Sequence, residues 1–348
     1  MSVTGQEPRG VHLVGSVPLE NAEQVFRATS AILGERVKRI PDGETGARTN
    51  WIGWQAGVLM QHPAFEIVPP ADPKYAALPV FRLTDKSSGK VHFSDLGYAT
   101  AAKESYALFA RLKKEGVVPE NARFQVSLPT PIATVAAFIA TADQAEVEPA
   151  YEARMLEEMN EIAQAVPRDQ LAIQWDVAVE FGIMEGVWKP EPGIEQDQVS
   201  LVARLVRIGQ AVPEDVELGY HLCYGDAGHE HFVQPKDTAR LVLVANAIAA
   251  GLKRPLNWIH MPVPRERDDD AYFAPLKGLK LHPGTELYLG LVHLTGGEEA
   301  TRKRIEAAQR TVSVFGVGTE CGMGRRNSET IPELLKMHAA VAGPQSGG

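Results

Sequence analysis

The regular alternation of short apolar segments with helical segments constrains the fold of this chain more than any other feature. Eight apolar segments are predicted to be buried strands: residues 11–16, 37–40, 124–128, 171–176, 216–221, 256–261, 286–293 and 312–318. Segments with helical spacing separate most of them, among them residues 19–33, 98–115, 197–211, 237–250 and 298–309. This order predicts a (β/α)8 TIM barrel, with an open doubly wound sheet as the alternative.

One barrel domain is expected over residues 1–342. Residues 50–100 are less regular and are predicted to form an insertion after the second strand. Within it, residues 80–84 and 91–93 flank a short polar stretch, which predicts a hairpin. A last helix is expected at about residues 331–341, and residues 343–348 are expected to be a disordered tail.

Reactive side chains gather at the carboxyl ends of the predicted strands. They are Ser16, Glu44, Ser127, Asp176, His221, Cys223, His260, His293 and Cys321. In a closed barrel all of these ends meet at one face, which is where barrel active sites are built. An open sheet would not bring all of them to one point.

The chain has only two cysteines, and both follow apolar segments. His221 and Cys223 are two positions apart at a strand end, so their side chains project to the same side. Cys321 would reach them from the last strand. Sulfur and nitrogen ligands in this number favour zinc. The alternative is two buried structural cysteines and an ordinary core histidine. His229 and His231, which follow, are expected to lie in an exposed loop.

Composition narrows the possible partners and the compartment. The chain has 348 residues and a net charge of −9, which argues against nucleic acid or an anionic membrane as the main partner. No apolar run approaches the roughly 20 residues of a membrane span. The N-terminus is polar and has no apolar signal core. Two cysteines make no disulfide framework, so a cytoplasmic, reducing compartment is expected.

Six short motifs, in the right order and with similar spacing, carry a family resemblance. They lie at residues 14–18 (Val-Gly-Ser-Val-Pro), 42–44 (Asp-Gly-Glu), 174–176 (Gln-Trp-Asp), 221–224 (His-Leu-Cys-Tyr), 292–293 (Val-His) and 320–325 (Glu-Cys-Gly-Met-Gly-Arg). Over nearly its whole length the chain resembles the C-terminal catalytic barrel of cobalamin-independent methionine synthase. That family belongs to a superfamily that also holds uroporphyrinogen decarboxylase.

The resemblance implies a bound metal and a bound thiol. It implies a Zn²⁺ ion with three protein ligands, which are His221, Cys223 and Cys321. It implies an amino-acid thiol held by three further residues, which are Ser16, Glu44 and Asp176. His293 would act as an acid near the leaving group.

The sequence departs from the family at two places. The family has a glutamate as a further zinc ligand, whereas residues 258–265 contain no acid. His260 could replace it, Glu266 could reach back, or water could fill the position. Val177 stands where the family has a second acid after Asp176, with Glu180 nearby. The chain is also expected to lack the N-terminal half-barrel of the long enzymes, and with it part of their folate-binding region. The identity of the substrate is therefore left undetermined.

The first hypothesis is a zinc-dependent transferase that moves a methyl or small alkyl group onto a substrate thiol. A free thiol has a pKa near roughly 8.5, and zinc would remove its proton and hold the nucleophilic thiolate. The donor would be a reduced folate, a corrinoid protein or a simpler methylated compound. Related zinc enzymes of the superfamily alkylate other thiols, such as coenzyme M. The alternatives are a metal-free lyase like uroporphyrinogen decarboxylase and a catalytically silent thiol- or zinc-binding barrel.

Overall fold

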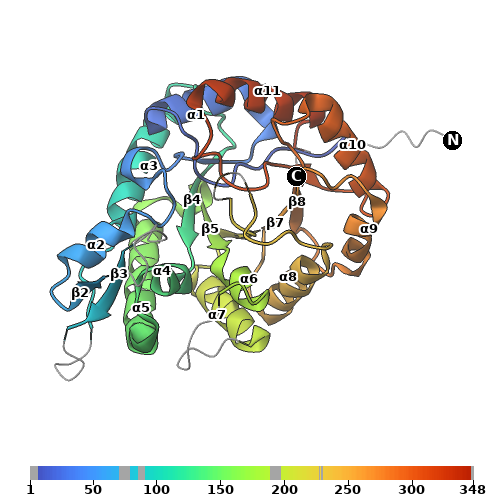
Figure 1. Cartoon of the computed structure of the whole chain (residues 1–348). Helices are drawn as coiled ribbons and strands as arrows, with labels where there is room; N and C mark the ends of the chain where they lie inside the picture. The colour runs from blue at the N-terminus through green and yellow to red at the C-terminus, as the bar shows by residue number, and fades with distance from the viewer. Residues whose placement is uncertain are drawn as a thin grey trace.

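A parallel sheet forms the centre of the molecule. The computed structural model describes residues 7–69, 79–84, 91–188, 197–226, 228 and 230–345. Within these residues the sheet has seven strands. In spatial order they are β1 (Arg39–Pro41), β4 (Arg123–Pro129), β5 (Leu171–Val177), β6 (Glu217–Leu222), β7 (Trp258–Pro262), β8 (Glu286–Gly290) and β9 (Gly316–Val317). Spatial order follows chain order and every pair is parallel, so the sheet curls as in a TIM-like barrel (Figure 1).

Seven of the predicted strands are thus confirmed, and the first one differs. Around residues 11–16 the described backbone makes only isolated parallel bridges, from Val11 to Val37 and to Val317. The backbone N–H of Val11 donates to the carbonyl of Arg36 at 2.7 Å, and that of His12 donates to Val317 at 2.8 Å. The first segment therefore links the two edge regions of the curved sheet without forming a full strand.

Side chains inside the sheet explain why this segment does not form a longer strand. The amide of Gln125 donates to the carbonyls of Leu13 and Val14, at 2.9 and 3.0 Å. The amide of Gln174 donates to the carbonyl of Val14 at 2.6 Å. Because buried carbonyls must be paired, these two glutamines supply the bonds that a neighbouring strand would otherwise provide.

Helices surround the sheet (Figure 1). They are α1 (Ala22–Leu33), α2 (Gln55–Gln61), α3 (Tyr98–Lys114), α4 (Pro131–Phe138), α5 (Thr141–Ala165), α6 (Val179–Met184), α7 (Gln198–Ala211), α8 (Ala239–Gly251), α9 (Asp270–Phe273), α10 (Gly297–Gln309) and α11 (Ile331–Val341). Each predicted helix is present, and the side chain of Asp197 caps α7 by accepting hydrogen bonds from the backbone N–H groups of its first turn. The short helices α2, α4 and α6 have no counterpart among the predicted segments, because one or two turns give too little periodicity.

The insertion contains a two-stranded antiparallel sheet, but the predicted hairpin is wrong. Strand β3 (Val80–Leu83) pairs with β2 (Phe65–Val68), and residues 91–93 form no strand. Phe93 instead packs as a buried side chain, with its ring stacked on that of Phe65 at 6.0 Å. Phe93 is apolar because its side chain is buried in the core. The local sequence pattern cannot distinguish such a residue from one in a paired strand. Residues 85–90, the predicted turn, lie outside the described residues.

The two ends of the described chain are joined. The backbone N–H of Gly343 donates to the carbonyl of Pro8 at 2.9 Å, and that of Gly10 donates back to Gly343 at 3.1 Å. The side chain of Gln345 donates to the hydroxyl of Tyr288 at 2.7 Å. Residues 343–345 of the expected tail are thus packed against the body, and residues 346–348 lie outside the described residues. Among the described residues no helix is long and apolar enough to cross a membrane.

Candidate metal centre and substrate cavity

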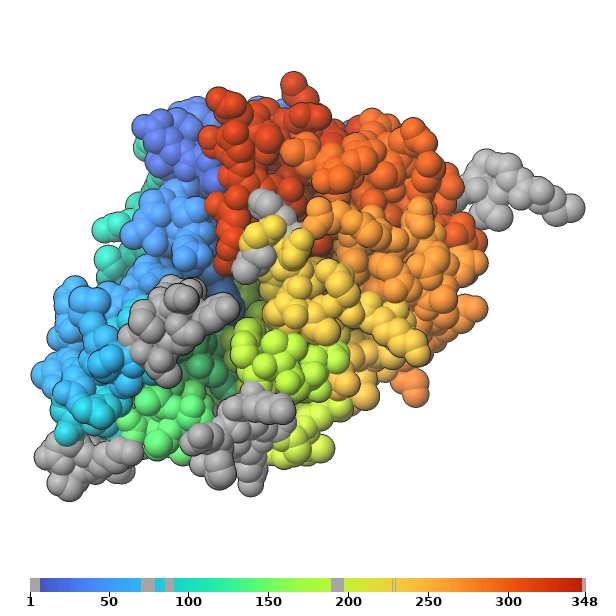
Figure 2. All heavy atoms as spheres, in the orientation of Figure 1, coloured from blue at the N-terminus to red at the C-terminus, as the bar shows by residue number. Residues whose placement is uncertain are grey.

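A cavity of about 870 Å³ opens where the carboxyl ends of the strands meet. Its walls come from residues in six separate parts of the chain, which fall within the ranges 14–16, 44–53, 136–144, 176–188, 221–232 and 321–325. In the space-filling view these differently coloured segments surround a central recess (Figure 2). The position is the one that the barrel fold predicts for a site, because strand ends and their loops converge there.

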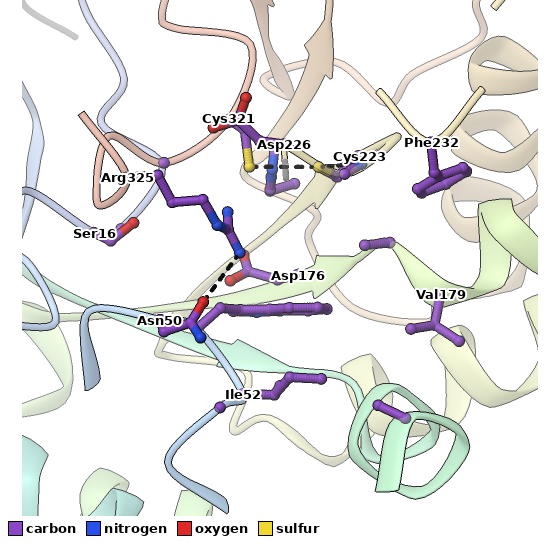
Figure 3. A pocket seen from close by; sticks show the side chains of 18 of the residues that line it. Ser16, Asn50, Ile52, Asp176, Val179, Cys223, Asp226, Phe232, Cys321 and Arg325 are labelled. Carbon is purple, nitrogen blue, oxygen red and sulfur yellow. Dashed lines mark hydrogen bonds between the residues drawn. The ribbon is translucent and has the colours of Figure 1, made fainter. Parts of the chain in front are cut away.

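Three predicted metal ligands lie together in this cavity. The ligand atoms of His221, Cys223 and Cys321 are all within 4.8 Å of one another. The two Sγ atoms are 3.5 Å apart (Figure 3). His221 lies near the end of β6 and Cys223 just beyond it, so the strand directs both inward, while Cys321 arrives on the loop after β9. The spacing of one nitrogen and two sulfurs suits a tetrahedral ion.

His260 lies behind His221 and is not part of this group. The Nδ1 atoms of the two rings are 2.7 Å apart, so one ring donates to the other. The remaining ring nitrogen of His221, Nε2, is buried and has no hydrogen-bond partner among the described residues. Burial lowers the pKa of His221 well below its usual value and that of His260 to about 3. Both rings are therefore neutral at pH 7, which is the form that binds metals.

The two thiols also fit a cation. The pKa of Cys321 is raised well above its usual value, first by the hydrogen bond with Cys223 and then by burial and nearby negative charge. The backbone N–H of Gly225 donates to the sulfur of Cys223 at 3.2 Å. Without a positive charge nearby, the Cys321 thiol would keep its proton. A divalent cation between them would hold both as thiolates.

A pair of acids lies across the cavity from the thiols. Asp176, at the end of β5, is 6% exposed, and burial raises its pKa to about 8, although hydrogen bonds from Gln174 and Trp51 oppose this shift. The pKa of Glu44 is raised by burial and by the charges of Asp176 and Asp42. Two buried acids whose pKa values are raised favour a positively charged ligand, because a cation would stabilise their charged forms.

The backbone around Glu44 is adapted to this position. Glu44 has a φ of 48°, in the left-handed region that disfavours side chains with a Cβ. A Cβ on Gly15 would lie 2.8 Å from the Glu44 carboxylate, so only glycine leaves the acid in place. Strain at such a residue is more common at functional sites than elsewhere.

Ser16 connects the first strand end with the loop that carries Cys321. Its hydroxyl accepts a bond from the backbone N–H of Gly324 at 3.2 Å, and its carbonyl accepts from that of Met323 at 2.7 Å. Ser16 also lines the cavity, as does Arg325, whose guanidinium donates to Asn50 at 3.5 Å (Figure 3). The three substrate residues implied by the resemblance, Ser16, Glu44 and Asp176, thus share one end of the cavity.

The structure places His293 outside the wall of the cavity. Its Nε2 donates to the carbonyl of Val263 at 2.8 Å, and its Nδ1 faces Glu320 at 3.5 Å. Glu320 also faces His231, which does line the cavity, at 3.4 Å. Burial raises the pKa of Glu320, but the hydrogen bond and charge of His293 outweigh it and the pKa is lowered. Glu320 therefore lies between His293 and His231, which lines the cavity.

Several residues of the site were missed in the sequence. The expectation of an exposed loop at His231 is wrong, because its side chain is only 2% exposed, and His229 lies outside the described residues. Nothing in the local pattern distinguishes a loop histidine that folds inward from one in solvent. Trp188 and Phe232 also line the cavity, and their loops carry no motif. Glu180, the nearby acid, is buried in α6 and does not line it.

Comparison with known proteins supports the fold. No family model and no curated protein matches the sequence. A B12-independent methionine synthase from Shewanella sp. W3-18-1, solved with selenomethionine, matches with a TM-score of 0.61 and 14% identity, over 96% of each chain. A putative vitamin-B12 independent methionine synthase from Listeria monocytogenes matches with a TM-score of 0.57 and 15% identity, over 97% of this chain and 99% of that one.

A methyltransferase from Methanosarcina mazei matches with a TM-score of 0.55 and 12% identity, over 98% of this chain and 94% of that one. At such low identities these matches establish fold and not activity. The chain therefore has the fold of B12-independent methionine synthase and methyltransferase structures along nearly its whole length.

Proposed function

We propose that this protein is a zinc-dependent transferase that moves a methyl or small alkyl group onto the thiol of a small molecule. The observation that carries the proposal is the group of His221, Cys223 and Cys321 inside a cavity that is also lined by the acids Glu44 and Asp176. The likeness to methionine synthase and methyltransferase structures supports the same reaction class.

The protein would hold the metal through one neutral imidazole and two thiolates. His260 keeps His221 in the tautomer and orientation that leave Nε2 for the ion. Zinc bound there would lower the pKa of a substrate thiol and hold its sulfur as a nucleophile. An N–H bond from Gly225 to Cys223 stabilises negative charge on that ligand.

The acids at the other end would position the substrate. A primary ammonium group would suit Glu44 and Asp176, because it would stabilise the charged forms that burial disfavours in both acids. Arg325, at the same end, suits a carboxylate. An amino-acid thiol has both groups, and Ser16 lies beside them. Binding at this end would direct the sulfur toward the cysteines.

A departing group that needs a proton would receive it from the side of His231. His293 is proposed as the acid behind it, since Glu320 lies between the two histidines at 3.4 and 3.5 Å. Because Nε2 of His293 is committed to Val263, a proton on the other nitrogen would be shared with Glu320. The three side chains could thus pass one proton toward the cavity.

A metal-free lyase of the uroporphyrinogen decarboxylase kind receives less support. A substrate with several carboxylates needs several cationic contacts, and Arg325 is the only arginine or lysine among the described residues that line the cavity. Free thiols also fit a reducing, cytoplasmic setting, which we retain as part of the proposal.

Zinc content tests the proposal directly. Protein purified without added chelator should contain about one zinc per chain, and Cys223→Ser and His221→Asn should each lose it. His282→Asn, at an exposed histidine, is the matched control and should keep the metal. Zinc-free protein with two reactive thiols and full alkyl-transfer activity would overturn the proposal.

A further inference from the structure

An aromatic pair forms one wall of the cavity and has no role in the mechanism above. The rings of Trp188 and Phe232 are 4.9 Å apart and tilted by 48°. Both residues line the cavity, and Trp188 is 42% exposed, although tryptophan side chains are usually well buried. Ring surface that is open inside a cavity is available to a ligand.

Two glycines leave room for this pair. A Cβ on Gly182 in α6 would collide with the ring of Trp188, and a Cβ on Gly225 would lie 2.7 Å from the ring of Phe232. Gly225 also donates its N–H to Cys223. The chain of contacts from Cys223 through Gly225 to Phe232 places the aromatic pair beside the thiols. In Figure 3 Phe232 lies beyond Cys223, on the side away from Ser16 and Arg325.

Most of the titratable side chains that line the cavity are acidic. The acids are Glu44, Asp176, Asp226 and Glu230. Among the described lining residues one arginine opposes them, Arg325, which lies at the opposite end and donates to Asn50. A cation would stabilise the charged forms of these acids, whereas a polyanionic donor would be repelled by each of them that is ionised.

We propose that the wall formed by Trp188 and Phe232 is the subsite of an onium methyl donor, a small sulfonium or quaternary ammonium compound. Aromatic faces attract methylated cations through their quadrupoles, and ammonium cages in proteins are built in this way. The inference rests on the proposed function and specifies its second substrate.

The reaction with such a donor is balanced without an acid. The substrate sulfur, already without its proton, forms a bond to the methyl carbon. The bond from that carbon to the onium sulfur or nitrogen breaks, and its electron pair stays on the departing atom. A neutral sulfide or amine leaves, so nothing has to protonate it. This agrees with the position of His293 behind Glu320, away from the cavity wall.

Binding of a matched pair of probes to the zinc-loaded full chain tests the inference. Choline and 3,3-dimethylbutan-1-ol have nearly the same shape, and only choline is charged. By calorimetry choline should bind about tenfold tighter or more, the range that a desolvated cation–π contact provides. Trp188→Leu and Phe232→Leu should bring the two affinities within about twofold of each other. Trp54→Leu, at a tryptophan that does not line the cavity, is the control.

The outcomes separate this inference from the proposed function. Equal affinity for both probes in the wild type, or an unchanged ratio in both leucine variants, would refute the onium subsite and leave the zinc result intact. A preference for choline in a protein that binds no zinc would keep the cation subsite and refute the transferase. Thermal unfolding of each variant identifies a loss that comes from misfolding, and Gly182→Ala then provides a second perturbation of Trp188.

Discussion

Replacement of Asp176 by asparagine should make the protein more stable and less able to bind its substrate. The carboxyl is 6% exposed, and its pKa is about 8 in the folded chain. Because a raised pKa means that folding disfavours the charged form, the stability linked to this group is fully present below the unfolded pKa near 3.8 and is lost as the pH rises through about 8.

The magnitude follows from this difference. At ~1.4 kcal/mol per pH unit, a carboxyl with these two pKa values reduces the free energy of unfolding by about 4 kcal/mol at pH 7. Glu44 titrates with Asp176, and its own pKa is raised by the Asp176 charge, so the amide would relieve both acids. Allowing for relaxation around the pair, we expect Asp176→Asn to stabilise the protein by about 2 kcal/mol at pH 7.

The appropriate assay is urea unfolding of zinc-free, reduced protein at pH 6, 7.5 and 9. Without bound zinc, the free energy of unfolding has no contribution from pH-dependent metal release. The stability difference between variant and wild type should grow by about 2 kcal/mol between pH 6 and pH 9. Asp268→Asn, at an exposed position, should change stability by less than about 0.5 kcal/mol at every pH. A variant no more stable than wild type, with no pH dependence, would mean that Asp176 is ionised and well paired.

Three further predictions concern the neighbouring groups. Replacing His260 with leucine should weaken zinc binding about 10- to 100-fold in a chelator competition, because His221 loses the bond that orients it; an unchanged affinity would exclude this role. Gly15→Ala should destabilise the protein by about 1–3 kcal/mol in urea, because its Cβ would lie 2.8 Å from a carboxylate, and full stability would show that the loop yields freely. Removing zinc under air should join Cys223 and Cys321 in a disulfide, seen by mass spectrometry as the loss of two hydrogens, because the sulfurs are only 3.5 Å apart; persistent free thiols would contradict the observed geometry.

The strands could be predicted because parallel strands buried on both faces appear as continuous apolar runs. Five of the seven begin and end within two residues of the predicted positions, whereas β8 ends three residues early and β9 covers only two of the seven predicted residues. The first segment is also apolar, yet it makes only isolated bridges, since Gln125 and Gln174 bind its carbonyls from within the sheet. That arrangement depends on residues more than a hundred positions away, which no local pattern contains.

Pairing in the insertion could not be predicted for the same reason. The apolar residues of 91–93 look like a strand, but Phe93 packs on Phe65 and leaves β3 to pair with β2. His231 likewise follows a polar loop sequence, and its burial depends on Glu320 from the last loop.

Some features of the site were determined by the sequence alone. His221 and Cys223 project together because alternate residues of a strand share a side, and the strand position of Asp176 directs it to the same face. Only the tertiary structure decided what surrounds them. It brought Cys321 to 3.5 Å from Cys223, set His260 behind His221, and kept His293 outside the cavity wall. The physical reason is that spacing along a strand is fixed by covalent geometry, whereas contacts between loops depend on packing across the whole barrel.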